Sequence, residues 1–306
     1  MTMKYQESEL SLNLQYLNQL LIDKEYSLEY RQGLKSLMMK NALKKRDFSF
    51  FLKHLKVKLF RRDFYGVNGN YKFQCQRNME EYSILPKVAV YTCIIGNYDT
   101  VMEPLFVNDD IDYFIFTDQA VDRMSKWKKI DVTNFKEYKY VNATVLNRKI
   151  KILPYIYLNN YDYSIYIDGN IQIIADVMPL ILKMKDSSLG VHTHAIRDCI
   201  YREANGVELL KKANPEKVKE QINRYKAEGF PEHFGLFQNS ILIRNHNSVI
   251  GRRLMDLWWK EYSEELTRDQ LSLPYAIWKM KLDIKEIAIL GRDVYRNPRF
   301  RVINHL

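Results

Sequence analysis

The sequence predicts an α/β protein built on a mainly parallel sheet that is covered by helices. Short apolar runs alternate with helix-length segments after residue 86, and runs that are apolar on both faces are typical of strands inside a parallel sheet. A chain of 306 residues with 46% hydrophobic content can bury the core of one large domain and carry an extension. The apolar runs are KVAVYTCII (87–95), DYFIFTD (112–118), YSIYIDG (163–169), SLGVHTH (188–194) and NSILIRN (239–245).

Residues 1–82 are predicted to form a basic, helical extension that ends in a linker. Leucines recur at three- and four-residue steps in this region, and no proline interrupts residues 7–62. The stretch YGVNGNYKFQCQRNMEEYS (65–83) is polar and contains glycine, as linkers do. The α/β domain is therefore expected to occupy residues 83–306.

The net charge of +10 is concentrated in one part of the extension. Residues 35–62 hold ten Lys or Arg and one Asp, so they alone contribute +9. Their apolar residues fall largely at helical spacing, and a basic amphipathic helix binds anionic membrane surfaces. The alternative is that the apolar stripe packs on the main domain and the lysines form a solvated face. Nucleic acid is not expected as a partner, because no nucleic-acid-binding motif is recognisable.

The cysteines and the N-terminus predict a compartment. Cys75, Cys93 and Cys199 are widely spaced, which implies no disulfide framework and favours a reducing environment. The first residues are acidic and polar where a signal peptide needs a basic start and an apolar run. No run of eighteen apolar residues occurs. We expect a cytoplasmic protein that the basic segment could hold at the inner face of the membrane.

Polar residues follow several of the predicted strands, and ligands of open α/β sheets bind outside the carboxyl ends of the strands. The first loop, IIGNYD, has one glycine and lacks the G-x-G-x-x-G fingerprint of dinucleotide binding, and the P-loop signature is absent. A dehydrogenase and a P-loop kinase are therefore not supported. The candidate residues at these strand ends are Thr92, Asn97, Tyr98, Asp99, Asp118, Asp168, Asn170, His192 and His194.

The sequence Asp168-Gly169-Asn170 interrupts two apolar runs and permits two interpretations. These residue types suit a tight turn without any ligand. A carboxylate at the end of a buried strand can also face a cleft and carry chemistry there.

The order of motifs resembles a glycosyltransferase-like domain family that is named after plant proteins of mucilage synthesis and turgor regulation. The resemblance covers roughly residues 86–280 and implies the GT-A fold, in which a nucleotide-sugar donor lies across the carboxyl edge of a Rossmann-like sheet. It rests on YTCIIGNYD, DYFIFTD, NRKIKILPY, YDYSIYIDGNI, HTHAIRDCIYREA, GLFQNSILIRNHN, WWKEY and TRDQLSLPYA.

The resemblance gives Asp168 and Asn170 the positions of the GT-A metal-binding motif. A hard divalent cation, Mn²⁺ or Mg²⁺, would there neutralise the charge of the leaving diphosphate. Asn170 replaces a second carboxylate by a neutral amide, so metal dependence is in doubt. His305 could complete such a metal site.

Basic residues in NRKIKILPY are expected to reach the donor phosphates. Arg148 and Lys151 precede an apolar, helix-like stretch, and a helix start binds phosphate. A cation from this motif could also substitute for a weakly bound metal. Asp118 resembles the position that contacts the base in related folds, and its alternative role is a helix N-cap.

Three further motifs, HTHAIRDCIYREA, GLFQNSILIRNHN and TRDQLSLPYA, supply candidates for the sugar, the acceptor and proton transfer. Asp269 is expected to start a helix and to stay exposed there. The resemblance implies that it takes the proton from the acceptor hydroxyl, and its alternative role is a helix N-cap. His192 is the second candidate for proton transfer. The expected substrate-binding residues are His194, Arg197, Arg202, Glu203, Gln238, Asn239 and Gln270.

These observations predict a glycosyltransferase that moves a sugar from a nucleotide-sugar donor, with UDP as the first candidate nucleotide, to a glycan or lipid-linked acceptor. Bacterial surface-polysaccharide synthesis is the expected setting. One alternative is a carbohydrate- or membrane-binding module that kept the fold and lost the chemistry. The other is a hydrolase that uses Asp269 and a histidine and needs no nucleotide.

Overall fold

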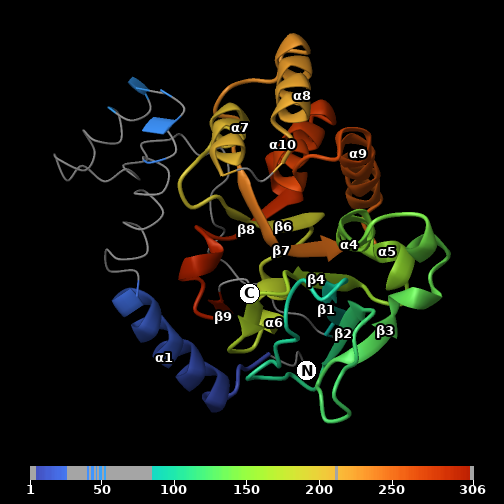
Figure 1. Cartoon of the computed structure of the whole chain (residues 1–306). Coiled ribbons are helices and arrows are strands. Elements are labelled where there is room, and N and C mark those ends of the chain that lie inside the picture. The colour runs from blue at the N-terminus through green and yellow to red at the C-terminus, as the bar shows by residue number, and fades with distance from the viewer. Residues whose placement is uncertain are drawn as a thin grey trace.

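A seven-stranded sheet in the order β3-β2-β1-β4-β7-β6-β8 forms the centre of the molecule (Figure 1). The computed structural model describes residues 5–25, 85–210 and 213–303, and the single positions 40, 43, 44, 46, 48, 49 and 52. The strands of this sheet are β1 (Val88–Ile94), β2 (Ile111–Thr117), β3 (Lys128–Asp131), β4 (Tyr163–Ile167), β6 (Leu189–Thr193), β7 (Phe237–Asn245) and β8 (Ile287–Gly291).

The sheet is mostly parallel, as the both-face apolar runs predicted. Strand β1 runs parallel to β2 and β4, β2 parallel to β3, and β6 parallel to β8. Only β7 is antiparallel to its neighbours among these strands, β4 and β6. The carboxyl ends of β1, β2 and β4 therefore meet at one edge of the sheet, where the candidate residues had been expected.

Helices cover both faces of the sheet (Figure 1). The α-helices of the described residues are α1 (Glu9–Glu25), α4 (Ala143–Ile152), α5 (Pro154–Tyr157), α6 (Met178–Leu182), α7 (Ile200–Leu209), α8 (Pro215–Ala227), α9 (Val249–Glu265) and α10 (Asp269–Lys279). Short 3-10 turns are η1 (Val132–Asn134), η2 (Lys136–Lys139), η3 (Ile284–Glu286) and η4 (Val294–Arg296).

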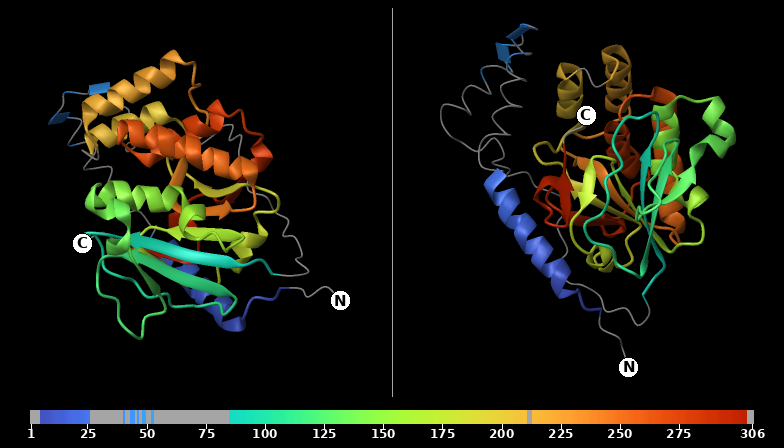
Figure 2. Two further views of the ribbon diagram at one scale, coloured as in Figure 1. Left: turned by 90° about the vertical axis from the view of Figure 1, so that its right-hand side faces the viewer. Right: turned by 60° about the horizontal axis from the view of Figure 1, so that its bottom comes forward.

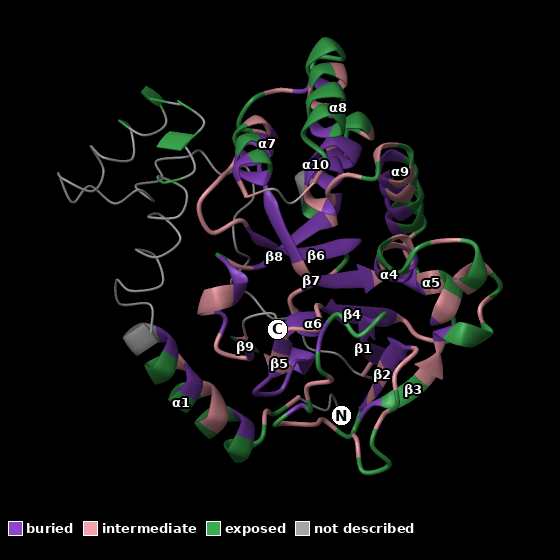
Figure 3. Cartoon of the chain, in the orientation of Figure 1, coloured by how far each residue is buried: buried purple, intermediate pink, exposed green. Residues whose placement is uncertain are grey.

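The hydrophobic core has a layer on each face of the sheet, and the strands between them are mostly buried, apart from the edge strand β3, whose residues are exposed or half-buried (Figure 3). Helices α4, α9 and α10 pack on one face, and α6 packs on the other. The indole of Trp258 on α9 is buried and donates to the backbone oxygen of Asp269 at 3.0 Å. This bond fixes the start of α10 against α9, so Trp258 is a core residue.

A small second sheet follows directly on the Asp168 turn. Strand β5 (Ile171–Ile173) pairs antiparallel with β9 (Phe300–Val302). The apolar run after the turn therefore leaves the central sheet and pairs with the C-terminal part of the chain.

Helix α1 lies along the outside of the α/β domain (Figure 2). Its polar residues hold it there: Asn18 donates to the backbone oxygen of Phe300 at 3.1 Å, and the hydroxyl of Ser11 accepts from the backbone of Asp176 at 2.7 Å. Its outer face is apolar and exposed, with Leu10, Leu12, Tyr16, Leu17, Leu20 and Leu21. One side of α1 is thus bound to the domain and the other is open.

Most of the basic segment 35–62 lies outside the described residues. The apolar positions described within it, Leu43, Phe48 and Leu52, are exposed. At these three positions the stripe does not pack on the main domain. Within the described parts of the chain, no helix combines the length and the apolar character that crossing a bilayer requires.

Candidate functional site

Asp168 follows β4 directly, at the carboxyl edge of the sheet. Its backbone N–H donates to Ser240 on β7 at 2.8 Å, and its backbone oxygen accepts from Ile171 at 3.0 Å. A Cβ added to Gly169 would lie 2.9 Å from Cγ1 of Ile94 and 3.1 Å from Oδ2 of Asp99. The turn therefore needs glycine because the β1 end and its loop press against it, and this brings Asp99 beside the Asp168 turn.

A buried lysine joins two carboxylates that are far apart in the sequence. The Nζ of Lys151 lies 3.3 Å from Oδ1 of Asp168 and 2.9 Å from Oδ2 of Asp269. The side chain of Lys151 is 2% exposed, that of Asp269 4%, and that of Asp168 29%. Arg148 adds a second cation, with its Nε 3.7 Å from Oδ1 of Asp269. The structure thus unites four residues that the sequence had proposed in three separate motifs.

Arg148 and Lys151 come from the second half of α4, so the expectation that they precede a helix is wrong. The helix begins earlier because the side chain of Asn142 accepts from the backbone of Val145 at 2.8 Å and caps it. It ends before Pro154, which cannot continue the helical hydrogen bonding. The two cations therefore reach the strand ends as side chains of the last helical turns, without help from a helix N-terminus. Lys149 points elsewhere and pairs with Glu137 at 2.6 Å.

Asp269 starts α10 as predicted, but the expectation that it stays exposed is wrong. Burial alone would raise the pKa of Asp269, but the charges of Lys151, Arg148 and Arg268 outweigh it and hold that pKa below its usual value. The carboxylate is therefore ionised at neutral pH and paired with its cations. A proton acceptor of this kind is weak, because a low pKa reduces the driving force for proton transfer.

The loop after β1 is fixed by the end of β2. The backbone N–H of Gly96 lies 3.1 Å from both oxygens of Asp118, and Tyr138 of η2 donates to Asp118 at 3.0 Å. Gly96 and Asn97 have positive φ angles of 72° and 54°, a conformation that Gly and Asn tolerate. Asp118 thus supports the loop, where the sequence had offered a base contact or a helix N-cap.

The other candidates of this loop differ in exposure. Tyr98 is exposed, and Asp99 is buried beside Gly169. Thr92 lies within β1, and its buried hydroxyl has no hydrogen-bond partner in the described part of the chain. Of these residues, Tyr98 presents the largest open surface to a ligand.

A second cluster forms beyond β6. Arg197 donates to Glu203 at 2.6 Å, and Nε2 of His194 lies 3.8 Å from the same carboxylate. The guanidinium of Arg197 lies against α7, since a Cβ at Gly206 would meet it at 2.8 Å. Arg202 is exposed on α7 and stands outside this cluster. The structure therefore brings three of the four residues of this motif together.

His192 is not at the surface of the candidate site. It is 0% exposed within β6, and its Nε2 lies 2.9 Å from Nδ2 of Asn297. Burial lowers the pKa of His192 to about 3, which keeps the imidazole neutral. A neutral, enclosed imidazole is poorly placed to exchange protons with a substrate.

Gln238, Asn239 and Gln270 lie at the start of β7. Gln238 and Asn239 belong to β7, which begins two residues before the predicted apolar run 239–245. The side chain of Gln238 accepts from Val294 at 2.7 Å, and Gln270 donates to the backbone of Phe237 at 2.7 Å. Both amide atoms of Asn239 are buried and have no hydrogen-bond partner among the described residues. Asn239 is therefore the amide of this group that a ligand could satisfy.

The residues expected to bind a metal fit a divalent cation poorly. Oδ1 of Asp168 already contacts Lys151 and accepts from the hydroxyl of Tyr166 at 2.9 Å. Asn170 offers a neutral amide, and its Nδ2 donates to the backbone oxygen of Ile303 at 2.8 Å. In the described ranges, no three His, Cys, Asp or Glu side chains gather in a way that could hold a metal ion. His305, the third expected ligand, lies outside the described residues.

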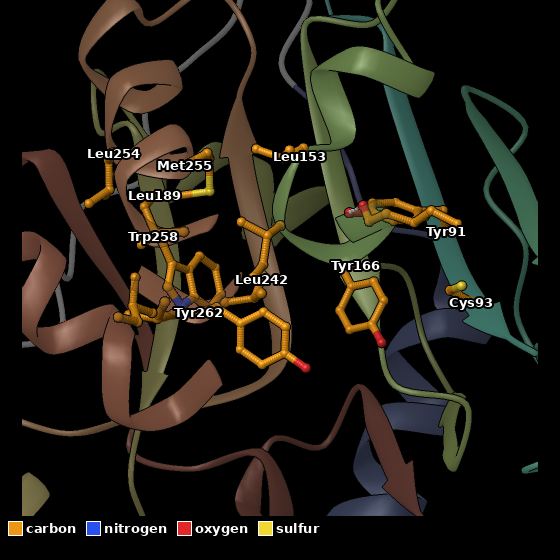
Figure 4. Close-up of a cluster of buried hydrophobic side chains, with 14 of the residues drawn as sticks. Tyr91, Cys93, Leu153, Tyr166, Leu189, Leu242, Leu254, Met255, Trp258 and Tyr262 are labelled. Carbon is orange, nitrogen blue, oxygen red and sulfur yellow. Dashed lines mark hydrogen bonds between the residues drawn. The ribbon is translucent and has the colours of Figure 1, made fainter. Parts of the chain in front are cut away.

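Tyr166 is a site residue that the sequence analysis missed. Its ring is buried in the core, and its hydroxyl lies at the edge of the hydrophobic cluster (Figure 4). Nζ of Lys151 lies 4.9 Å from the centre of this ring. Side chains two residues apart in a strand share a face, so the spacing of Tyr166 and Asp168 was the signal that could have revealed it.

Three comparisons relate the chain to known proteins. A protein of Arabidopsis thaliana named "Probable hexosyltransferase MUCI70" is 22% identical over 188 residues, which make up 57% of this chain and 32% of that protein. The solved structure "WbbM bifunctional glycosytransferase apo structure" has a TM-score of 0.41 and 12% identity, and the match covers 71% of this chain and 41% of that one. The chain thus matches about a third of the length of the plant relative.

The family comparison covers far more of the chain. The profile described as "TOD1/MUCI70, glycosyltransferase-like domain" matches residues 19–305. The match therefore extends beyond residues 86–280, where the motifs carried the resemblance, and begins within α1. The chain belongs to the TOD1/MUCI70 family of glycosyltransferase-like domains.

Proposed function

We propose that the chain is a nucleotide-sugar-dependent glycosyltransferase whose donor diphosphate binds at the carboxyl edge of the sheet. The observation that carries this proposal is the Lys151 cluster, which gathers two cations and two carboxylates at the end of β4. Paired cations suit a diphosphate, and a carboxylate beside them can accept from a ribose or sugar hydroxyl. Membership of a glycosyltransferase-like family supports the same reading.

The reaction is a displacement at the anomeric carbon of the donor sugar. The bond between that carbon and the diphosphate oxygen breaks, and the oxygen keeps the electron pair. The hydroxyl oxygen of the acceptor forms the new bond, and its proton leaves to water. Lys151 and Arg148 stabilise the charge that develops on the leaving diphosphate.

We assign Asp269 a positioning role in this reaction. Asp269 is buried and contacts both Arg148 and Lys151, so its charge holds these two side chains in position. Asp168 is the more exposed of the two carboxylates, and the two hydrogen bonds that its side chain accepts from described residues both fall on Oδ1. Asp168 is therefore the carboxylate that we expect to touch the donor.

The acceptor is proposed to approach from the side of the second cluster. His194, Arg197 and Glu203 combine donors and an acceptor, which is the chemistry that binds sugar hydroxyls or an acidic sugar. The buried, unsatisfied amide of Asn239 is the group that we expect a bound sugar to satisfy.

We also propose that the chain works at an anionic membrane surface, which would suit a lipid-linked acceptor. The support is the exposed apolar outer face of α1, followed in the sequence by residues 35–62 with their charge of +9. Apolar burial and attraction to anionic lipids add to each other in such a segment.

A thermal-shift screen of UDP, GDP, CMP and their sugars, each with chelator and with Mn²⁺, tests the proposed function. We expect one nucleotide family to raise the melting temperature of the wild type and to have little effect on Asp168→Ala. A carbohydrate-binding module would respond to sugars alone, and a hydrolase would turn over a glycoside without nucleotide. Either result would overturn the proposal.

A further inference from the structure

The ammonium group of Lys151 lies 3.3 Å from Asp168, the carboxylate to which the resemblance gave a metal-binding role. We propose that the ammonium group of Lys151 takes over the charge-neutralising role of the divalent cation, and that this chain binds and transfers its donor without a metal. The inference rests on the proposed function, because it concerns how the same site handles the donor diphosphate.

The ammonium group is held by contacts that prevent it from leaving. Asp168 and Asp269 contact it at 3.3 and 2.9 Å, and the ring of Tyr166 lies beneath it at 4.9 Å. A positive charge is stabilised over an aromatic face. The side chain is 2% exposed, so water cannot replace these partners readily.

The backbone of Lys151 is fixed as firmly as its side chain. Its carbonyl oxygen accepts from the buried guanidinium of Arg244 at 2.8 Å and from the hydroxyl of Tyr91 at 3.0 Å. These bonds tie the end of α4 to β7 and β1. A cation anchored at both ends is pre-organised, and it needs no rearrangement when charge develops on the donor.

A divalent cation bound to Asp168 would be repelled by the positive charge of Lys151. Any metal bound to Asp168 would lie close to the fixed charge of Lys151, and like charges repel strongly where water is excluded. The neutral Asn170 cannot compensate as a second carboxylate would. Removing the lysine would leave Asp269 buried without its nearest partner, so displacement of Lys151 by a metal is also unfavourable.

The wild-type protein alone provides the first test. Calorimetry with UDP, GDP and CDP in chelator and in Mn²⁺ should give, for the nucleotide that binds, dissociation constants that agree within about threefold. The Mn²⁺ spectrum in electron paramagnetic resonance should not differ between nucleotide mixtures with and without protein. The rate of sugar transfer should be the same in chelator as in Mn²⁺.

Variants of α4 provide the second test. Lys151→Met should weaken binding of that nucleotide by more than about tenfold. Lys149→Met, the matched control on the same helix, should leave it unchanged because Lys149 pairs with Glu137 outside the site. If Lys151→Met does not fold, the double variant Lys151→Met/Asp269→Asn removes both charges of the buried pair and should fold but bind weakly.

The outcomes separate this inference from the proposed function. Tight nucleotide binding that appears only with Mn²⁺, together with binding of Mn²⁺ by the protein, would overturn the inference. The proposed transferase function would still stand. Unchanged binding by a folded Lys151→Met variant would also overturn it. Failure of every nucleotide to bind in either condition would overturn both proposals.

Discussion

The ammonium group of Lys151 lies 2.9 Å from the carboxylate of Asp269, and both side chains are withdrawn from solvent. One comes from the end of α4 and the other from the start of α10, so two helices on the same face of the sheet share one buried charge pair. The same ammonium group reaches Asp168 at the end of β4. The pair therefore links the helical layer to the edge of the sheet where we place the donor.

The first prediction concerns Asp168. Asp168→Ala should lower transfer by about a hundredfold or more, because it removes the more exposed of the two carboxylates and one partner of Lys151. Initial transfer rates, corrected for the folded fraction from circular dichroism, measure this. Asp162→Ala is the matched control, because Asp162 accepts from the backbone of Lys87 at 2.8 Å at the opposite end of β4. Equal transfer by the two variants would make Asp168 a turn residue only.

The second prediction separates a positioning role of Asp269 from that of a general base. Asp269→Asn should weaken nucleotide binding and slow transfer together, because Lys151 and Arg148 lose the charge that holds them. Calorimetric binding and transfer rates are measured on the same preparation. Loss of a general base would instead leave binding intact while transfer falls by about a hundredfold. That result would return Asp269 to the role of proton acceptor.

The third prediction concerns pH and His192. Burial lowers the pKa of His192 to about 3, whereas an unfolded histidine titrates near 6.5. Below about pH 6.5 the unfolded state takes up a proton that the native state refuses, so the free energy of unfolding falls by about 1.4 kcal/mol per pH unit from this group. Above that pH the contribution is fully present.

Urea unfolding of the wild type and of His192→Gln, measured at about pH 7.5 and at about pH 5, checks this. The wild type should lose more stability than the variant as the pH falls. His246, whose pKa burial lowers to about 4, titrates in both proteins and cancels in the difference. If the free energies of unfolding of the two proteins fell equally with pH, His192 would be accessible to protons in the native state, as a catalytic histidine would be.

The fourth prediction concerns the outer face of α1. Vesicles that contain anionic lipid should bind the full chain, and high salt should weaken this binding because exposed charge attraction is screened. Leu17→Ser/Leu20→Ser should reduce sedimentation with vesicles, because both leucines are exposed on α1. Transfer to a soluble acceptor should be unaffected. Equal binding by neutral and anionic vesicles would contradict a role for the basic segment.

The strands and their polar ends could be predicted from the sequence because their determinants are local. A continuous apolar run indicates a strand buried on both faces, and a charged residue at its end is conspicuous. Asp168 was found in this way. The helix carrying Lys151 was misjudged, although Asn142 and Pro154 mark its bounds. Reading these two residues together would have placed the cation in the last turn of α4.

The burial of Asp269 could not be predicted from the sequence, because its partners come from another helix. A carboxylate at a helix start is normally exposed, and only the packing of α4, α9 and α10 removes this one from water. Tyr166 was hidden for a similar reason, since its ring belongs to the core and only its hydroxyl reaches the site. Such residues join core and site, and their roles emerge from tertiary contacts.

The central claim is that a nucleotide sugar gives up its sugar at the Lys151 and Asp168 edge of the sheet. The most direct measurement incubates the wild type and Asp168→Ala with the nucleotide sugar that stabilises the protein and with a candidate acceptor, and follows released nucleoside diphosphate and glycosylated product together. We expect the two products in equal amounts from the wild type, and neither from the folded variant. Equal product formation by both proteins would contradict the account.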